Sequence, residues 1–185
     1  MSRSQVLLNR KNTGLIVIDV QEKLVPAIHN NKEVIGNCVK LIEGFKALDL
    51  PVFVTEQYPE GIGKTVKSIH NALGDIAVKE KMIFSCMGIE GFALELRKAR
   101  LDYIVLCGIE THVCLWQSSM DLLNDGFNVT VASDCVSSRK ESDRITALTR
   151  MAQNGVQVAS CEMILFELLE KSGDEEFKKI LSIIK

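Results

Sequence analysis

The chain has 185 residues, of which 46% are hydrophobic and 25% are charged, the composition of a globular protein with a sizeable core. This length predicts a single domain over residues 1–185, and the composition excludes a disordered chain. The 22 Lys and Arg residues and 24 Asp and Glu residues give a formal net charge of −2, without a long block of one sign. We therefore expect no nucleic acid and no anionic membrane among its partners.

No stretch approaches the roughly 20 apolar residues that cross a bilayer, and residues 1–10 lack the apolar centre of a signal peptide. The sequence therefore predicts a cytoplasmic protein. Its six cysteines form no CxxC pair and no Cys/His cluster with the spacing of a zinc site. We expect free thiols, no metal and no organic cofactor.

Short apolar runs rich in β-branched residues predict buried strands. They are residues 13–19, 51–55, 103–107, 127–132 and 156–159. Amphipathic segments with helical period lie between and after them. These are residues 31–48, 90–100, 114–123, 142–151, 163–169 and 177–184. Alternation of strand and helix predicts an α/β fold, a doubly wound parallel sheet with helices on both faces.

Residues 55–81 break this rhythm, because they contain Pro59 and three glycines and only a short apolar set around 66–73. We expect a long excursion over the sheet with a short helix and a short strand at 76–79. Binding crevices of open α/β sheets lie at the carboxyl ends of their strands, where such excursions start.

Two charged residues next to apolar runs are candidates for chemistry. Asp19 follows four apolar residues, a position where burial can tune a carboxylate for proton transfer, although it could equally cap the next turn. In residues 78–85, three charges adjoin a strand fragment, and one lysine could point inward. The residues alone do not choose between Lys79 and Lys81.

The segment 106–114 ends a strand, turns at Gly108 and enters a helix, which places Cys114 near the first helical turn. The free N–H groups and the helix dipole at such a position lower the pKa of a thiol and make it a nucleophile. The same N–H groups could bind a developing oxyanion. For the cysteines elsewhere, a buried structural role is the simpler interpretation.

Together, Asp19 in Ile-Asp-Val-Gln, Lys81 in Glu-Lys-x-x-Phe-Ser and Cys114 in Gly-Ile-Glu-Thr-x-x-Cys resemble the motifs of the isochorismatase-like cysteine hydrolases. This superfamily includes nicotinamidase and N-carbamoylsarcosine amidase. The resemblance spans nearly the whole chain and implies a six-stranded parallel sheet, a small-molecule substrate and assembly into a homo-oligomer.

The resemblance also implies roles. Cys114 is the nucleophile, Asp19 the base that takes its proton, and Lys81 the cation that stabilises the thiolate and positions Asp19. Family members carry a cis peptide at the position of Ile109 and Glu110, which aims the N–H groups of Glu110 and Cys114 at an oxyanion. The implied reaction is hydrolysis of a C–N bond, amide or carbamoyl, through a covalent acyl-thioester.

Four side chains are candidates for the substrate pocket: Gln57, Phe84, Ile109 and Trp116. Residues 55–59, Thr-Glu-Gln-Tyr-Pro, replace the Asp-x-His element with which nicotinamidases bind a metal. One Glu without a nearby histidine is a poor site for a transition metal, so we expect none.

Two other functions keep the same fold. The protein could be a binding or scaffold member whose partner is another protein. It could also be a thiol redox protein in which Cys107 or Cys135 resolves an oxidised Cys114.

Overall fold

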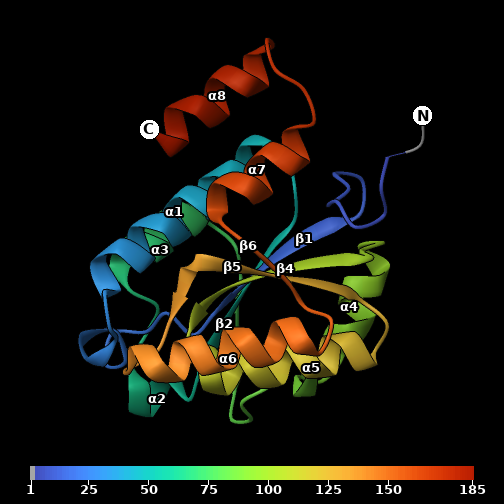
Figure 1. Cartoon of the computed structure of the whole chain (residues 1–185). Helices are drawn as coiled ribbons and strands as arrows, with labels where there is room; N and C mark the ends of the chain where they lie inside the picture. Colours follow the sequence, from blue (N-terminus) through green and yellow to red (C-terminus); the bar gives the residue numbers. More distant parts are fainter. Residues whose placement is uncertain (1–2) are drawn as a thin grey trace.

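The computed structural model describes residues 3–185 and contains one six-stranded sheet in the order β3-β2-β1-β4-β5-β6. Every neighbouring pair of strands is parallel (Figure 1). The strands are β1 (Thr13–Ile18), β2 (Val52–Gln57), β3 (Val78–Lys81), β4 (Tyr103–Ile109), β5 (Asn128–Ser137) and β6 (Gln157–Ala159). The order reverses at β1, since β2 and β4 flank it, which is the doubly wound topology predicted from the sequence.

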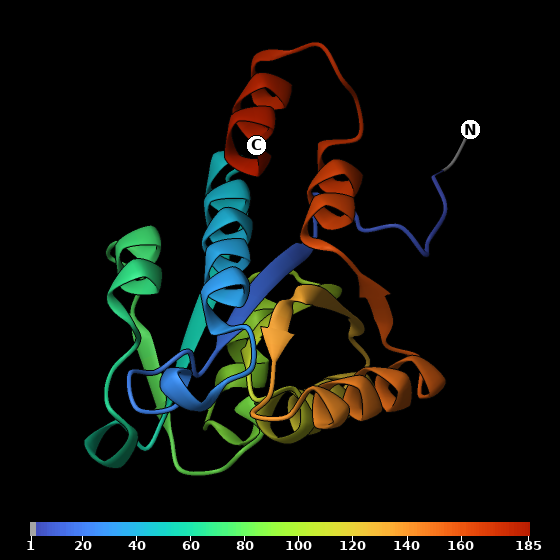
Figure 2. The same cartoon turned by 60° about the vertical axis from the view of Figure 1, so that its left-hand side comes forward.

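Helices cover both faces of the sheet. The α-helices are α1 (Asn31–Ala47), α2 (Pro59–Ile62), α3 (Lys67–Leu73), α4 (Phe92–Lys98), α5 (Trp116–Asn124), α6 (Glu141–Gln153), α7 (Cys161–Leu169) and α8 (Glu175–Ile184). Shorter helical turns are η1 (Val25–Ala27), η2 (Cys86–Gly88) and the π-helix η3 (Thr111–Leu115). In Figure 1, α1, α3 and α7 lie on one side of the sheet and α4, α5 and α6 on the other. Helix α8 packs on α1 and α7, away from the sheet (Figure 2).

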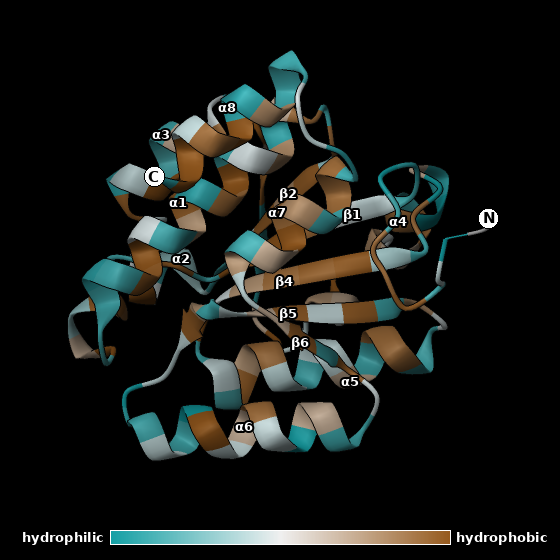
Figure 3. Cartoon of the chain, turned by 45° about the horizontal axis from the view of Figure 1, so that its top comes forward, coloured by the Kyte–Doolittle hydropathy of each residue, from teal (hydrophilic) through white to brown (hydrophobic). Residues whose placement is uncertain are grey.

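The sheet separates two apolar cores. Side chains of alternate strand residues enter opposite cores: Leu15 and Val17 face α1 and α7, whereas Ile16 and Ile18 face α4 and α5. All six residues of β1 are buried, as expected for a central parallel strand covered on both faces. In Figure 3 the central strands are mostly hydrophobic, while the helices alternate between hydrophobic and hydrophilic residues.

Every strand differs from its predicted bounds, by at most two residues at either end except for the end of β5. Strand β5 runs to Ser137, whereas the sequence predicted an end at residue 132. The polar residue Asp134 stays in the strand because its carboxylate accepts a hydrogen bond from the N–H of Cys161 (2.7 Å) and its carbonyl one from Asn37 (3.0 Å). The strand predicted at 76–79 is β3, Val78–Lys81, two residues later.

The register of the sheet assembles its carboxyl edge. Lys81, the last residue of β3, pairs with Gln57, the last residue of β2, and Ile18 of β1 lies beside Gly108 of β4. The residues after β1, β3 and β4 therefore converge, although they lie far apart in the sequence. Within residues 3–185, no helix is both long and apolar enough to span a membrane.

Candidate active site

Asp19 lies at the bottom of the site, at the carboxyl end of β1. Its backbone has φ 53°, a left-handed conformation that Asp tolerates better than most side chains. The side chain is 0% exposed. Its Oδ1 accepts a hydrogen bond from the Thr55 hydroxyl on β2 (2.7 Å), and its backbone N–H donates to the Thr55 carbonyl (3.2 Å). Both the backbone turn and the carboxylate are thus held by one neighbouring residue.

The Lys81 ammonium is the second charge of the site. Its Nζ donates to Asp19 Oδ2 (2.6 Å), Gln57 Oε1 (2.8 Å) and the carbonyls of Phe84 (3.0 Å) and Ile83 (3.3 Å). Both side chains of the Asp19–Lys81 ion pair are fully buried. Since an ammonium has three hydrogens, these four acceptors already occupy its donor capacity. Lys81 therefore fixes the position of the Asp19 carboxylate.

Lys79, the alternative that the sequence left open, points to the surface. Its Nζ pairs with Glu95 of α4 at 2.6 Å, and both side chains remain partly exposed. The two lysines are two residues apart and so start from the same face of β3, but Lys81 lies at the carboxyl end of the strand, beside Gln57, whereas Lys79 lies beside Thr55.

Gln57 at the end of β2 binds Lys81, and Gln21 in turn binds Gln57. Gln57, a predicted pocket residue, is 8% exposed, and its side-chain N–H donates to the Met82 carbonyl at 2.8 Å while its Oε1 accepts from Lys81. The Gln21 side chain accepts from the Gln57 backbone N–H (2.8 Å) and donates to the carbonyls of Gln57 (2.9 Å) and Gly63 (2.6 Å). In this arrangement the polar atoms of Gln57 support the lysine.

The third element is the turn after β4. Gly108 has φ +119°, and a methyl group there would overlap the carbonyl oxygen of Ile18, so no larger residue lets β4 approach β1 this closely. The peptide bond between Ile109 and Glu110 is cis. The Glu110 carbonyl then accepts from the N–H groups of Val113 (3.1 Å) and Leu115 (3.3 Å) at the π-helix η3. This turn carries Cys114 to the site.

The Cys114 thiol lies close enough to the Asp19 carboxylate and the Lys81 ammonium for both charges to act on its pKa. Burial raises its pKa to about 12, and the Asp19 charge raises it further than Lys81 lowers it. The sequence predicted a lowered pKa from the helix terminus, and this prediction is wrong. The thiol is 7% exposed, and the positive charge beside it is already neutralised by Asp19. Cys114 therefore rests as a neutral thiol.

The other predicted pocket residues lie in different places. Ile109 is buried at the end of β4, and the Phe84 ring is half-exposed while its carbonyl binds Lys81. Trp116 lies under the Arg150 guanidinium of α6, 4.1 Å from it, and both line a cavity of about 210 Å³ together with His112. The His112 ring Nδ1 lies 2.9 Å from the Ser138 hydroxyl.

The resolving cysteines suggested for an oxidised Cys114 are on the wrong side of the sheet. Cys107 and Cys135 belong to the core under α1 and α7, whereas Cys114 and Cys86 belong to the core under α4 and α5. Side chains of β4 alternate between faces, and this alternation sends Cys107 away from the site. Neither thiol can resolve Cys114 in this fold.

Sequence reasoning missed Thr55 and Gln21, which hold Asp19 and Gln57. Thr55 was visible only as the end of a predicted strand, and Gln21 as a residue two positions after Asp19. A polar residue at the end of an apolar strand, on the edge that carries the site, was the available signal. Across residues 3–185, no group of three or more His, Cys, Asp or Glu side chains could hold a metal ion.

Comparison with known proteins shows the family to which the chain is similar. Residues 13–163 match the isochorismatase domain. Isochorismatase domain-containing protein 1 of Salmo salar is 40% identical over 173 residues, which are 94% of this chain and 61% of that protein. The chain thus spans less than two thirds of the length of this relative.

Solved structures agree with the fold. The structure described as MAR1 ribonuclease from Caenorhabditis elegans has a TM-score of 0.91 and 36% identity, covering 96% of this chain and 92% of that one. The ycaC gene product of Escherichia coli, described as an octameric hydrolase of unknown specificity, has a TM-score of 0.90 at 20% identity. It covers 98% of this chain and 92% of its own, and at this identity it is similar in fold alone.

Proposed function

The chain belongs to the isochorismatase domain family, and we propose that it is a cysteine hydrolase that cleaves an amide or carbamoyl C–N bond of a small molecule. The observation that carries this proposal is the fully buried Asp19–Lys81 pair within reach of the Cys114 thiol. A buried base next to a thiol is the arrangement that nucleophilic acyl transfer requires.

The first half of the reaction starts from a neutral thiol. As the Cys114 sulfur attacks the carbonyl carbon, Asp19 accepts the thiol proton, so the thiolate forms only during the attack. The N–H groups of Glu110 and Cys114 are the proposed donors to the oxyanion. When the C–N bond breaks, Asp19 returns the proton to the leaving nitrogen and an acyl-thioester remains on Cys114.

In the second half, Asp19 removes a proton from a water molecule that attacks the thioester. The carboxylic acid leaves and the proton returns to the Cys114 sulfur, which restores the resting thiol. Lys81 makes no contact with substrate in this scheme, because its hydrogens are used by Asp19, Gln57 and two carbonyls. Its role is to hold Oδ2 of Asp19 in position.

Two residues of β2 hold the ion pair in position. The Thr55 hydroxyl donates a hydrogen bond to Asp19 Oδ1, and Gln57 Oε1 accepts one from the Lys81 ammonium. The loop after β3 borders a cavity of about 430 Å³, lined by residues 80–83 and 88–90. With Met82, Ile83 and Phe84 exposed there, we propose that an apolar part of the substrate binds this loop.

By analogy with the octameric neighbour, we also propose a homo-oligomer.

The test is release of ammonia from a panel of primary amides and N-carbamoyl amino acids, with mass spectrometry of the intact protein during turnover. We expect hydrolysis of at least one compound and an acyl adduct on Cys114. Replacing Cys114→Ala should abolish both, whereas Cys161→Ala, which removes a thiol on the opposite face of the sheet, should retain them.

An RNA oligonucleotide belongs in the same assay, because a nematode relative is described as a ribonuclease. Cleavage of RNA that survives Cys114→Ala would count against the cysteine hydrolase. So would a wild-type protein that hydrolyses no compound and forms no adduct, which would favour a binding or scaffold protein.

A further inference from the structure

The turn after β4 is held by a second segment, residues 137–139, which we call the β5 end. The Arg139 backbone N–H and its side-chain Nε both donate to Oε2 of Glu110, at 3.1 Å and 3.0 Å. Two residues further along the turn, the His112 Nδ1 lies 2.9 Å from the Ser138 hydroxyl. Three contacts thus join the β5 end to this turn.

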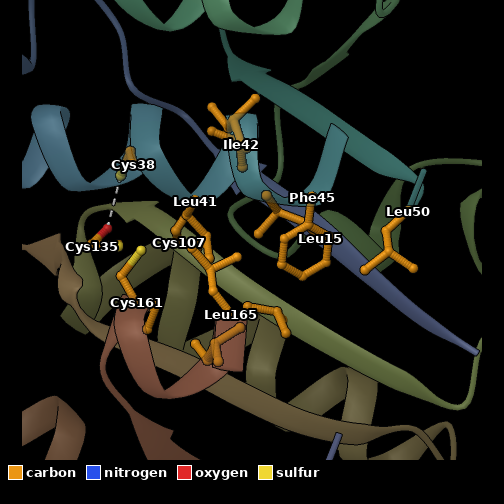
Figure 4. Packing of buried hydrophobic residues seen from close by; sticks show 14 of the residues in the cluster. Leu15, Cys38, Leu41, Ile42, Phe45, Leu50, Cys107, Cys135, Cys161 and Leu165 are labelled. Atoms are coloured by element: carbon orange, nitrogen blue, oxygen red, sulfur yellow. Dashed lines mark hydrogen bonds between the residues drawn. The ribbon is translucent and has the colours of Figure 1, made fainter. Parts of the chain in front are cut away.

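The β5 end continues a part of the strand that has its own supports. Strand β6 pairs with β5 only as far as Ala132, and side chains contact the residues beyond it. The Cys38 thiol on α1 donates to the Cys135 carbonyl at 3.1 Å (Figure 4). From the other face of the sheet, Nε of Arg144 on α6 donates to the Val136 carbonyl at 3.0 Å. Helices on both faces therefore hold the strand that carries the β5 end.

The members of the Glu110–Arg139 ion pair differ in exposure. The Glu110 side chain is 12% exposed, whereas that of Arg139 is 63% exposed. An ion pair with so exposed a member contributes little to the stability of the fold. It does fix a direction, because two donors of one residue converge on a single carboxylate oxygen of Glu110.

The Glu110 backbone is the part of this turn that the proposed mechanism uses. Its carbonyl accepts from the N–H groups of Val113 and Leu115, whereas its own N–H donates to no backbone carbonyl within residues 3–185. This N–H is therefore available to the oxygen of a tetrahedral intermediate. A donor to an oxyanion is effective only when the protein holds it in place before the reaction.

We propose that Arg139 is a positioning residue for the oxyanion donor, because it holds the Glu110 side chain and thereby directs the Glu110 N–H. The inference rests on the proposed cysteine hydrolase, in which that N–H binds the oxyanion. Arg139 acts through Glu110 and does not contact the substrate. Loss of a whole oxyanion donor costs roughly 100- to 1,000-fold in rate, and a displaced donor costs less, about tenfold.

The test uses propanal, a small aldehyde that requires no knowledge of the substrate. The Cys114 sulfur adds to the aldehyde carbon as the C=O π bond breaks, and the thiol proton passes to the oxygen. This reversible adduct has a tetrahedral centre whose oxygen lies where the oxyanion would form. Iodoacetamide instead alkylates the sulfur with loss of iodide and forms no such centre. Peptide mass spectrometry of Cys114 alkylation at increasing propanal concentrations gives the affinity of the adduct from the protection.

The first comparison is between two exposed arginines. Arg139→Met should weaken protection by propanal about tenfold and leave alkylation without propanal nearly unchanged. Arg97→Met is the matched control, since Arg97 is 54% exposed and pairs with Asp125 at 2.7 Å. That pair precedes the first residue of β5, at the opposite edge of the sheet, so this variant should keep wild-type protection.

Further variants test whether Arg139 acts through Glu110. Glu110→Ala should weaken protection more than Arg139→Met, because it also removes the bond from the Arg139 backbone N–H. Glu110→Gln should lose less than Glu110→Ala, since an amide oxygen still accepts from Arg139. Adding Arg139→Met to Glu110→Ala should cause no further loss, because both changes remove the same contact.

The outcomes separate this inference from the proposed function. Equal protection of the wild type and Arg139→Met would overturn the inference alone, as would fully additive effects in the double variant. Failure of propanal to protect Cys114 in the wild type would overturn both the inference and the proposed cysteine hydrolase.

Discussion

The Asp19–Lys81 ion pair should be among the most sensitive points of the fold. Both side chains are 0% exposed, and Lys81 provides the only cation that Asp19 contacts among the ion pairs of residues 3–185. Replacing Lys81→Met keeps the length and apolar stem of the side chain but leaves a buried carboxylate without its partner. Removal of one member of a buried pair costs about 3–5 kcal/mol of unfolding free energy.

A matched control lies two residues away on the same strand. Lys79 forms an ion pair of the same length, 2.6 Å, with Glu95, but this pair is partly exposed. Lys79→Met should therefore cost less than about 1 kcal/mol. For a chain of this size, about 2–4 °C of Tm corresponds to 1 kcal/mol, so Lys81→Met should lower Tm by roughly 6–20 °C.

The measurement is urea unfolding, followed by circular dichroism and by fluorescence of Trp116, the single tryptophan. A double-mutant cycle with Asp19→Asn isolates the pair, since Asn tolerates the left-handed backbone at this position and carries no charge. The double variant should lose less stability than the two single variants added together. Equal effects of Lys81→Met and Lys79→Met, or a strictly additive cycle, would refute the reasoning.

Two further predictions concern the nucleophile and its turn. With a pKa of about 12, Cys114 should be alkylated by iodoacetamide at a rate that increases about tenfold per pH unit from pH 7 to 10, and Asp19→Asn should accelerate alkylation at pH 8 because that carboxylate raises the pKa. Peptide mass spectrometry measures this, and a plateau below pH 8 would contradict it. Gly108→Ala should destabilise the protein through the overlap with Ile18, whereas Gly36→Ala, on an open face of α1, should stabilise it by about 0.5–1 kcal/mol in the same unfolding assay. Similar effects of the two Ala substitutions would show that the close approach of β4 to β1 is not required.

The order of strands and helices followed from local patterns in the sequence. Apolar runs such as 15–18 and the stripe along 34–45 depend only on neighbouring residues, so they predicted the doubly wound α/β sheet correctly. Bounds were wrong where a distant contact intervened. Strand β5 continues through Asp134 because Cys161, 27 residues later, satisfies its carboxylate.

The candidate site was predicted less completely. The resemblance to a known family pointed to Asp19, Lys81 and Cys114 as site residues, and the fold brings these three together. The sequence did not reveal that Gln57 binds Lys81, nor that Thr55 binds Asp19. Both contacts depend on which strands are neighbours and on their register, and neither follows from spacing along the chain.

The sequence by itself thus determined the type and order of the elements and the identity of the reactive groups. Only the tertiary structure determined the burial of these groups and the charges that surround them. Lys81 and Asp19 are 62 residues apart, and only the parallel pairing of β1, β2 and β3 buries one against the other. The charge state of Cys114 follows from that burial, because a thiol beside a neutralised, buried ion pair gains no net stabilisation as a thiolate.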